Sequence, residues 1–144
     1  MHKLSITARN ILESGFDPAT EFASLAHEKW RKGWITQNNG NSIPRIKKNS
    51  DGTEGDINQP FNKIHPDWQK ENLAAGQAAY DAVKKHGNDI ETASEVVHNE
   101  WMKRNPKEEW NAAQHVPYNE LPEEEKEKDR DHVRIMQSIL SKKR

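Results

Sequence analysis

The chain has 144 residues, of which 32% are hydrophobic and 31% are charged, and its formal net charge is −1. This length fits one domain with a modest core, the absence of cysteine excludes disulfides and thiolate chemistry, and the near-neutral charge gives no overall electrostatic case for nucleic acid. No apolar run is long enough to cross a bilayer and no signal peptide is visible in residues 1–14, so we expect a cytoplasmic protein.

The first third of the chain predicts two helices followed by a loop. A short apolar stripe over Leu4–Leu12 predicts an N-terminal helix. Asp17 and Pro18 provide an N-cap and a first-turn proline for a second helix, which is expected to run through about Trp30 and end near Gly33. Its inward face is predicted to consist of Phe22, Leu25, Ala26 and Trp30.

The segment 37–59 is rich in Gly, Asn, Ser and Asp and has no apolar period. Such composition is typical of a long surface loop, and loops of this length are usually functional or disordered. We therefore predict a loop without regular structure that is the most mobile interior part of the chain.

The rest of the chain predicts three more helices. His65-Pro66 opens a helix to about Lys85, Asp89 caps a helix over Ile90–Arg104, and Pro122 opens the last helix, which ends near Leu140. The charged run 123–131 within the last helix is expected to form a solvated face with glutamates too exposed to act as acids.

Two motifs occur twice. The segment from Leu25 to Trp30 parallels Val96 to Trp101, and each copy contains His-x-x-Trp. Similarly, Pro60 to Ile64 parallels Pro117 to Leu121. The chain thus reads as a single domain, 1–144, with one repeat at about 17–85 and another at about 89–142, neither of which could bury its apolar face alone.

The second copy carries the fuller pattern: His98, Trp101, a further tryptophan at Trp110, then Val-Pro-Tyr-Asn-Glu-Leu-Pro over 116–122 and a Glu/Lys-rich helix. This pattern resembles the ryanodine-receptor repeat (RYR domain) family. Glu109 stands where that family usually has glycine, and the loop 111–115 is shorter than in the family. The resemblance implies an all-α fold of tandem helix–loop–helix repeats with pseudo-two-fold symmetry, plus the N-terminal helix.

The resemblance also implies a ligand: the cleft between tandem repeats is expected to bind an adenine nucleotide, with Trp30 and Trp101 stacking on the base. Donors to phosphate or ribose are then expected among Arg104, Asn111, Arg31 and Lys32, and His27 and His98 are expected to line the pocket as polar groups. From the residues alone, a tryptophan on an amphipathic helix is more often part of the core than a ligand platform, so the interpretation as core stays open for both motif tryptophans. Each motif histidine is readable either as a pocket group or as a ring that bonds the backbone of the partner segment. Phe61 and Tyr118 are expected to be structural plugs beneath the turns.

No catalytic motif is visible, and the seven scattered histidines have no metal-ligand spacing, so we expect neither an enzyme nor a metal or cofactor site. The expected function is a ligand-binding module, a sensor or sequestering protein of the kind the resemblance implies for bacteria and phages. Two alternatives remain. One is a protein–protein adaptor that uses the loop 37–59. The other is a nucleic-acid binder that uses basic residues such as Arg45, Lys47 and Lys48, which the sequence pI of 6.7 makes the weaker hypothesis.

Overall fold

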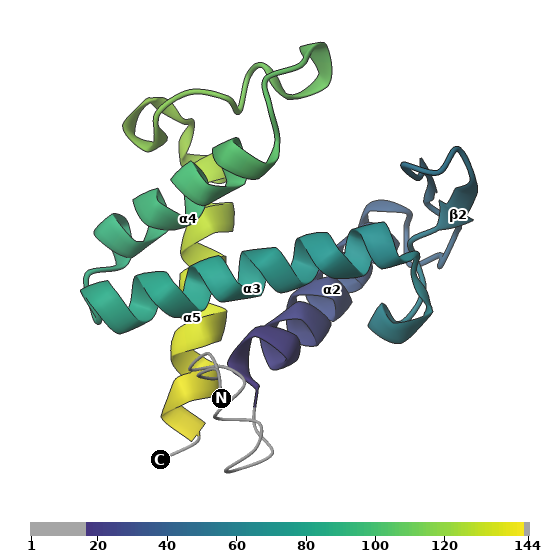
Figure 1. Ribbon diagram of the computed structural model, residues 1–144. Coiled ribbons are helices and arrows are strands. Elements are labelled where there is room, and N and C mark those ends of the chain that lie inside the picture. The colour runs from purple at the N-terminus through teal and green to yellow at the C-terminus, as the bar shows by residue number, and fades with distance from the viewer. Residues whose placement is uncertain (1–16, 143–144) are drawn as a thin grey trace, which may run out of the picture.

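The computed structural model describes residues 17–142, which form four long helices and a small hairpin (Figure 1). The predicted helix over Leu4–Leu12 lies outside the described residues. The helices are α2 (Pro18–Gln37), α3 (Pro66–His86), α4 (Ile90–Arg104) and α5 (Glu123–Lys142). No helix within residues 17–142 is long and apolar enough to cross a membrane.

The predicted helix starts are confirmed by their capping contacts. The Asp17 carboxylate accepts a hydrogen bond from the backbone N–H of Ala19, and the Asp89 carboxylate accepts one from Thr92. At the start of α3 the cap is a histidine: the backbone N–H of Asp67 donates to His65 Nδ1 over 3.0 Å. Pro18 and Pro66 occupy first-turn positions, where a missing N–H breaks no helical bond.

Helix α2 extends beyond its expected end near Gly33 and stops at Gln37. A single glycine costs a helix only about 1 kcal/mol, and the residues after it continue to pack. The predicted inward face is also partly wrong. Leu25 is 45% exposed and Trp30 is 36% exposed, whereas Phe22 is fully buried.

The expectation of a loop without regular structure over 37–59 is wrong at its centre. Strands β1 (Ile46–Lys48) and β2 (Glu54–Asp56) pair antiparallel, with Lys47 opposite Gly55. Gly52 turns the chain between them with φ +88°, a conformation that glycine adopts at little cost. The hairpin is held by polar contacts, since Asn49 and Asn58 are buried and both are hydrogen-bonded.

The doubled motif corresponds to a doubled element order. In each repeat a helix is followed by a connection, a 3₁₀ turn and a second helix; the turns are η1 (Phe61–Lys63) and η3 (Tyr118–Glu120), each preceded by proline. Ile64 and Leu121 are buried directly after these turns. Tyr118 is a buried plug as expected, but Phe61 is only half-buried, so Ile64 is the buried residue of the first copy.

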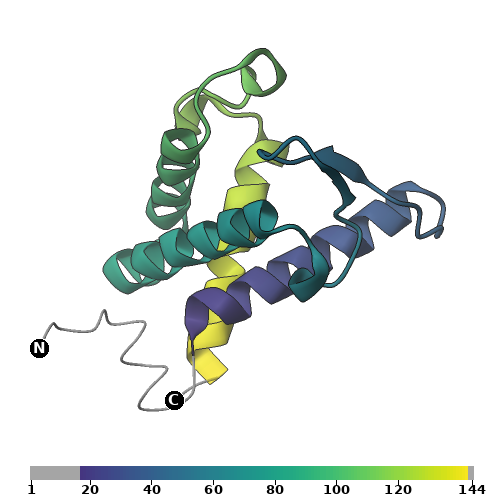
Figure 2. The ribbon, with the colours of Figure 1, turned by 45° about the vertical axis from the view of Figure 1, so that its right-hand side comes forward.

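The core lies where the four helices meet, as Figure 2 shows for α5, which passes behind α3. Its fully buried members are small or aliphatic apart from one phenylalanine: Phe22, Ala79, Ala93, Val133 and Met136. Both repeats therefore contribute to one core, and the tryptophans are left at its edge.

Candidate functional site

The two His-x-x-Trp motifs have the same geometry. His27 Nε2 lies 2.7 Å from the carbonyl oxygen of Gln59, and His98 Nε2 lies 2.7 Å from that of Val116. Each carbonyl belongs to the residue before the proline that opens the 3₁₀ turn. Both histidines are buried, and the interpretation of each as a ring bonded to the backbone of the partner segment is confirmed.

Each motif histidine also aligns the tryptophan one turn further along its helix. The rings of His27 and Trp30 stack with centroids 5.8 Å apart and 15° between their planes, and those of His98 and Trp101 with centroids 5.8 Å apart and 17° between planes. A carbonyl bond at one edge of the imidazole thus fixes a flat platform against which the indole lies. The tryptophan faces are held in a defined direction although neither indole is fully buried.

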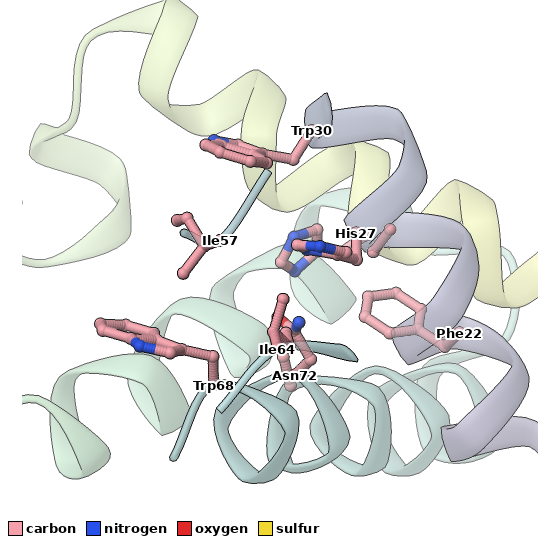
Figure 3. Close-up of a pocket in the computed structure, with 10 residues that line it drawn as sticks. Phe22, His27, Trp30, Ile57, Ile64, Trp68 and Asn72 are labelled. Atoms are coloured by element: carbon pink, nitrogen blue, oxygen red, sulfur yellow. The ribbon is translucent and has the colours of Figure 1, made fainter. Parts of the chain in front are cut away.

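Trp30 borders a cavity of about 250 Å³ between α2, α3 and the hairpin connection. Figure 3 shows Trp30 and Trp68 on opposite sides of this cavity, with the Ile57 side chain between them in this view. Trp68 comes from α3, and its indole N–H donates to Asn49 Oδ1 over 2.8 Å. The hairpin therefore positions the second aromatic wall. Asn72, His27 and Ile64 line the remaining sides.

Trp101 borders a second cavity, of about 390 Å³, between α4, α5 and the connection that joins them. Trp110 stands at its mouth and is 68% exposed. The other walls are more polar than those of the first cavity and include His98, Gln114, Glu125, Lys128 and Asp129. The two motif tryptophans thus line separate cavities, so the expectation that Trp30 and Trp101 stack on one base in a single cleft between the repeats is wrong.

His132 of α5 borders both cavities. Its ring packs edge-on against Phe22 with centroids 5.2 Å apart, and its Nδ1 is buried without a hydrogen-bond partner among residues 17–142. Burial, helped by the nearby Arg104 charge, lowers the pKa of His132 to about 4. The ring is therefore neutral at pH 7 and forms a wall that both cavities share.

Asp129 is the buried carboxyl of the second cavity, since its side chain is only 15% exposed. Burial, followed by repulsion from Glu125, raises the pKa of Asp129 to about 7. Its Oδ2 lies 3.5 Å from His98 Nδ1, the nitrogen that faces away from Val116. The charged run forms ion pairs such as Lys128 with Glu125, but the expectation of a solvated face is only partly right, because the side chains of Asp129, Arg130 and Lys126 are largely covered.

The residues predicted as ligand donors are mostly committed to the fold. Arg104 makes a two-pronged bond to Glu71 of α3, with both nitrogen–oxygen distances 3.0 Å. Asn111 is fully buried, and its Oδ1 accepts from the backbone N–H of Glu108 over 2.7 Å. Arg31 pairs with Glu28 and donates to Asn58. Lys32 is exposed and lines neither cavity described above.

The residues that sequence reasoning missed are the ones that distinguish the two cavities. Trp68 lies within the helix predicted from Pro66 to about Lys85, and Asp129 and His132 lie within the last predicted helix, but no sequence motif marks any of the three as a site residue. A signal was present: Asn72 and Asp129 lie 57 positions apart, as do Phe61 and Tyr118. Extending the repeat past the turn would have placed both at equivalent points, one turn beyond Trp68 and Glu125.

Among residues 17–142, no group of three or more His, Asp or Glu side chains is arranged to hold a metal ion. Comparisons with protein-family models, with curated proteins and with solved structures found no match for this chain.

Proposed function

We propose that the protein is a non-enzymatic binding module for an adenine nucleotide or a nucleotide-derived signal. The observation that carries this proposal is the pair of tryptophan-lined cavities that share His132. In each, a histidine bonded to a carbonyl aligns an indole face toward the space. Flat faces of this kind suit a purine ring, and stacking on an aromatic side chain contributes about 1–3 kcal/mol per base.

The same geometry favours recognition of the base and sugar over recognition of the phosphates. Arg104 and Arg31 already bond to Glu71 and Glu28. Lys128 lines the second cavity with an ammonium group that is largely exposed and lies 2.7 Å from Glu125. Surface ion pairs of this kind are weak, about 0–1 kcal/mol, so this lysine can turn to a phosphate at low cost. We therefore expect phosphates to add little affinity compared with the ring.

The proposal is tested by replacing the motif tryptophans and measuring ligand binding and stability on the same proteins. Trp30→Leu and Trp101→Leu remove an aromatic face while keeping apolar volume. We expect each to weaken the binding of adenosine and ADP-ribose, measured by calorimetry, by about tenfold or more, because each removes an aromatic face that contacts the ligand. The melting temperature is expected to change little, because neither indole is fully buried.

Trp34→Leu is the control for loss of an indole outside the cavities: Trp34 borders neither cavity and reaches the site only through Trp30, on which its ring stacks with centroids 6.0 Å apart. Its indole N–H donates to the carbonyl of Ile43, so this variant is expected to lose some stability and keep its affinity. The proposal fails if the wild-type protein binds no adenine compound, or if Trp34→Leu weakens binding as much as the two motif variants. If no adenine compound binds, the result favours the hypothesis of a protein–protein adaptor, because Ile43 and Ile46 present exposed apolar side chains near the hairpin.

A further inference from the structure

We propose that the two cavities form one bipartite site, in which the Trp30–Trp68 cavity takes an adenine-type base and the Asp129 cavity takes the vicinal diol of a ribose. This inference rests on the proposed function and assigns a separate recognition task to each repeat. It is carried by three observations: the shared wall, the amide in the first cavity and the carboxyl in the second.

The shared wall is His132. Its ring borders both cavities, so a ligand that reaches this residue from one side is adjacent to the space on the other. The Nδ1 atom of His132 is itself covered by protein atoms, so the ring serves as the wall between the two spaces and not as a hydrogen-bonding group toward the ligand.

The first cavity has the groups that a base requires. Trp30 and Trp68 provide two indole walls, and Figure 3 shows the Asn72 side chain on the α3 side between them and Phe22. No hydrogen bond joins the Asn72 amide to another described residue, so its donor and its acceptor are both available. An amide of this type pairs with the adjacent amino group and ring nitrogen of adenine through two hydrogen bonds.

The second cavity has a carboxyl group, that of Asp129, at the position where the first cavity has the Asn72 amide. Asp129 occupies the position equivalent to Asn72, and Gln114 occupies the position equivalent to Ile57. Among the described residues, the Asp129 carboxyl makes one ion-pair contact, with His98. The distance from Asp129 Oδ2 to His98 Nδ1 is long, at 3.5 Å. A buried carboxylate with so few donors gains from a ligand that supplies them, and the two hydroxyls of a vicinal diol donate to one carboxylate.

The test compares three compounds: adenosine, 2′,3′-dideoxyadenosine, which lacks the diol, and adenine. Affinities are measured by calorimetry on the wild-type protein, Trp68→Leu, Asp129→Asn and Asp131→Asn. The wild type is expected to bind adenosine about tenfold more tightly than the dideoxy compound, as hydrogen bonds to a charged group predict. In Asp129→Asn this ratio should approach one, while the affinity for adenine stays unchanged.

The other two variants separate base recognition from a general loss of structure. Trp68→Leu is expected to weaken the binding of all three compounds by a similar factor. The ratio of the adenosine affinity to the dideoxyadenosine affinity should stay unchanged. Asp131→Asn is the matched control: Asp131 lies on the same helix, pairs with Lys29 and Arg134, and borders neither cavity. It should behave as wild type in every titration.

Several results would overturn the inference while leaving the proposed function in place. These are a wild-type ratio near one, two adenine molecules bound per chain, or a loss of adenine affinity in Asp129→Asn. The wild-type ratio needs no variant, so the test holds even if Asp129→Asn does not fold. If no adenine compound binds the wild type, the proposed function fails, and the bipartite site fails with it.

Discussion

At the scale of single residues, two titratable side chains of α5, Asp129 and His132, lie near the junction of the cavities. Their pKa values are shifted in opposite directions. Burial raises the pKa of Asp129 to about 7 and lowers the pKa of His132 to about 4. Both shifts favour the neutral form, as desolvation does. The Asp129 carboxyl is therefore largely protonated below pH 7 and largely ionised above it, so the diol contact proposed above should be strongest above pH 7.

These shifts predict opposite pH dependences of stability. Between about pH 4 and 7 the folded state holds the Asp129 proton that the unfolded state has lost, so this residue makes stability fall as pH rises. Between about pH 4 and 6.5 the unfolded state holds a His132 proton that the folded state lacks, so this residue makes stability rise with pH. Each effect is at most about 1.4 kcal/mol per pH unit, and in the wild type they oppose each other.

We therefore expect Asp129→Asn to gain stability relative to wild type as pH rises from 4 to 7, by up to about 4 kcal/mol. His132→Gln should lose stability relative to wild type from pH 4 to 6.5, by up to about 3 kcal/mol. Urea unfolding at pH 4, 5, 6 and 7 measures both, and subtracting the wild-type value removes the contribution of the other carboxyls. Differences that stay constant across this range would contradict the two assignments.

The sequence predicts part of this residue-scale chemistry and misses the rest for a definite reason. The backbone bonds of His27 and His98 were an open alternative because the motif repeats beside a proline turn. Asp129 was missed because its neighbours Lys128 and Arg130 are charged, and local composition does not show which side of a helix is covered. Arg104 was taken as a free donor because its partner, Glu71, lies on another helix.

At the scale of elements, the helices were predictable and the hairpin was not. Capping residues and first-turn prolines mark helix starts in the sequence, and those starts are confirmed. The strands β1 and β2 have three residues each, too few for an alternating apolar pattern. Their stability comes from long-range contacts, such as the hydrogen bond from the Ser50 backbone N–H to Asp67 on α3.

The contact between α2 and α3 depends on Gly76. A Cβ atom at this position would lie 2.6 Å from the backbone oxygen of Ala19, and backbone of this kind cannot move aside cheaply. We expect Gly76→Ala to lower the free energy of unfolding by about 1–3 kcal/mol through overpacking. Urea unfolding measures the change.

Gly33→Ala is the control for this prediction, because Gly33 is also inside a helix but has open space around its Cβ position. Alanine there should raise stability by about 0.5–1 kcal/mol through helix propensity alone. If the two alanine variants change stability equally, the helices α2 and α3 do not approach as closely at Gly76 as described.

At the scale of the whole molecule, the two repeats share their interior. The buried cluster contains Phe22 and Ala79 of the first repeat together with Val97 and Met136 of the second. Ion pairs also cross between repeats, including Arg104 with Glu71 and Lys29 with Asp131. The repeated motifs predict two similar units, but they do not predict that α5 packs against α2 and α3.

This shared interior predicts that neither repeat folds alone. We expect the full chain to unfold in one transition, and fragments 17–86 and 87–142 to show no cooperative thermal unfolding by far-ultraviolet circular dichroism. Each fragment would expose the apolar face that the other covers, and units of this size bury too little surface to offset chain entropy. A fragment with a cooperative melt of its own would show that the repeats are independent.

The placement of the tryptophans gives the molecule a built-in optical reporter. The chain has five tryptophans, and Trp30, Trp68, Trp101 and Trp110 border the two cavities. Intrinsic emission therefore comes mostly from indoles that a bound ring would touch or shield from water. With Trp34→Phe, every remaining indole belongs to one cavity or the other. Single replacements in that background then identify which cavity a compound has entered, without attaching a dye.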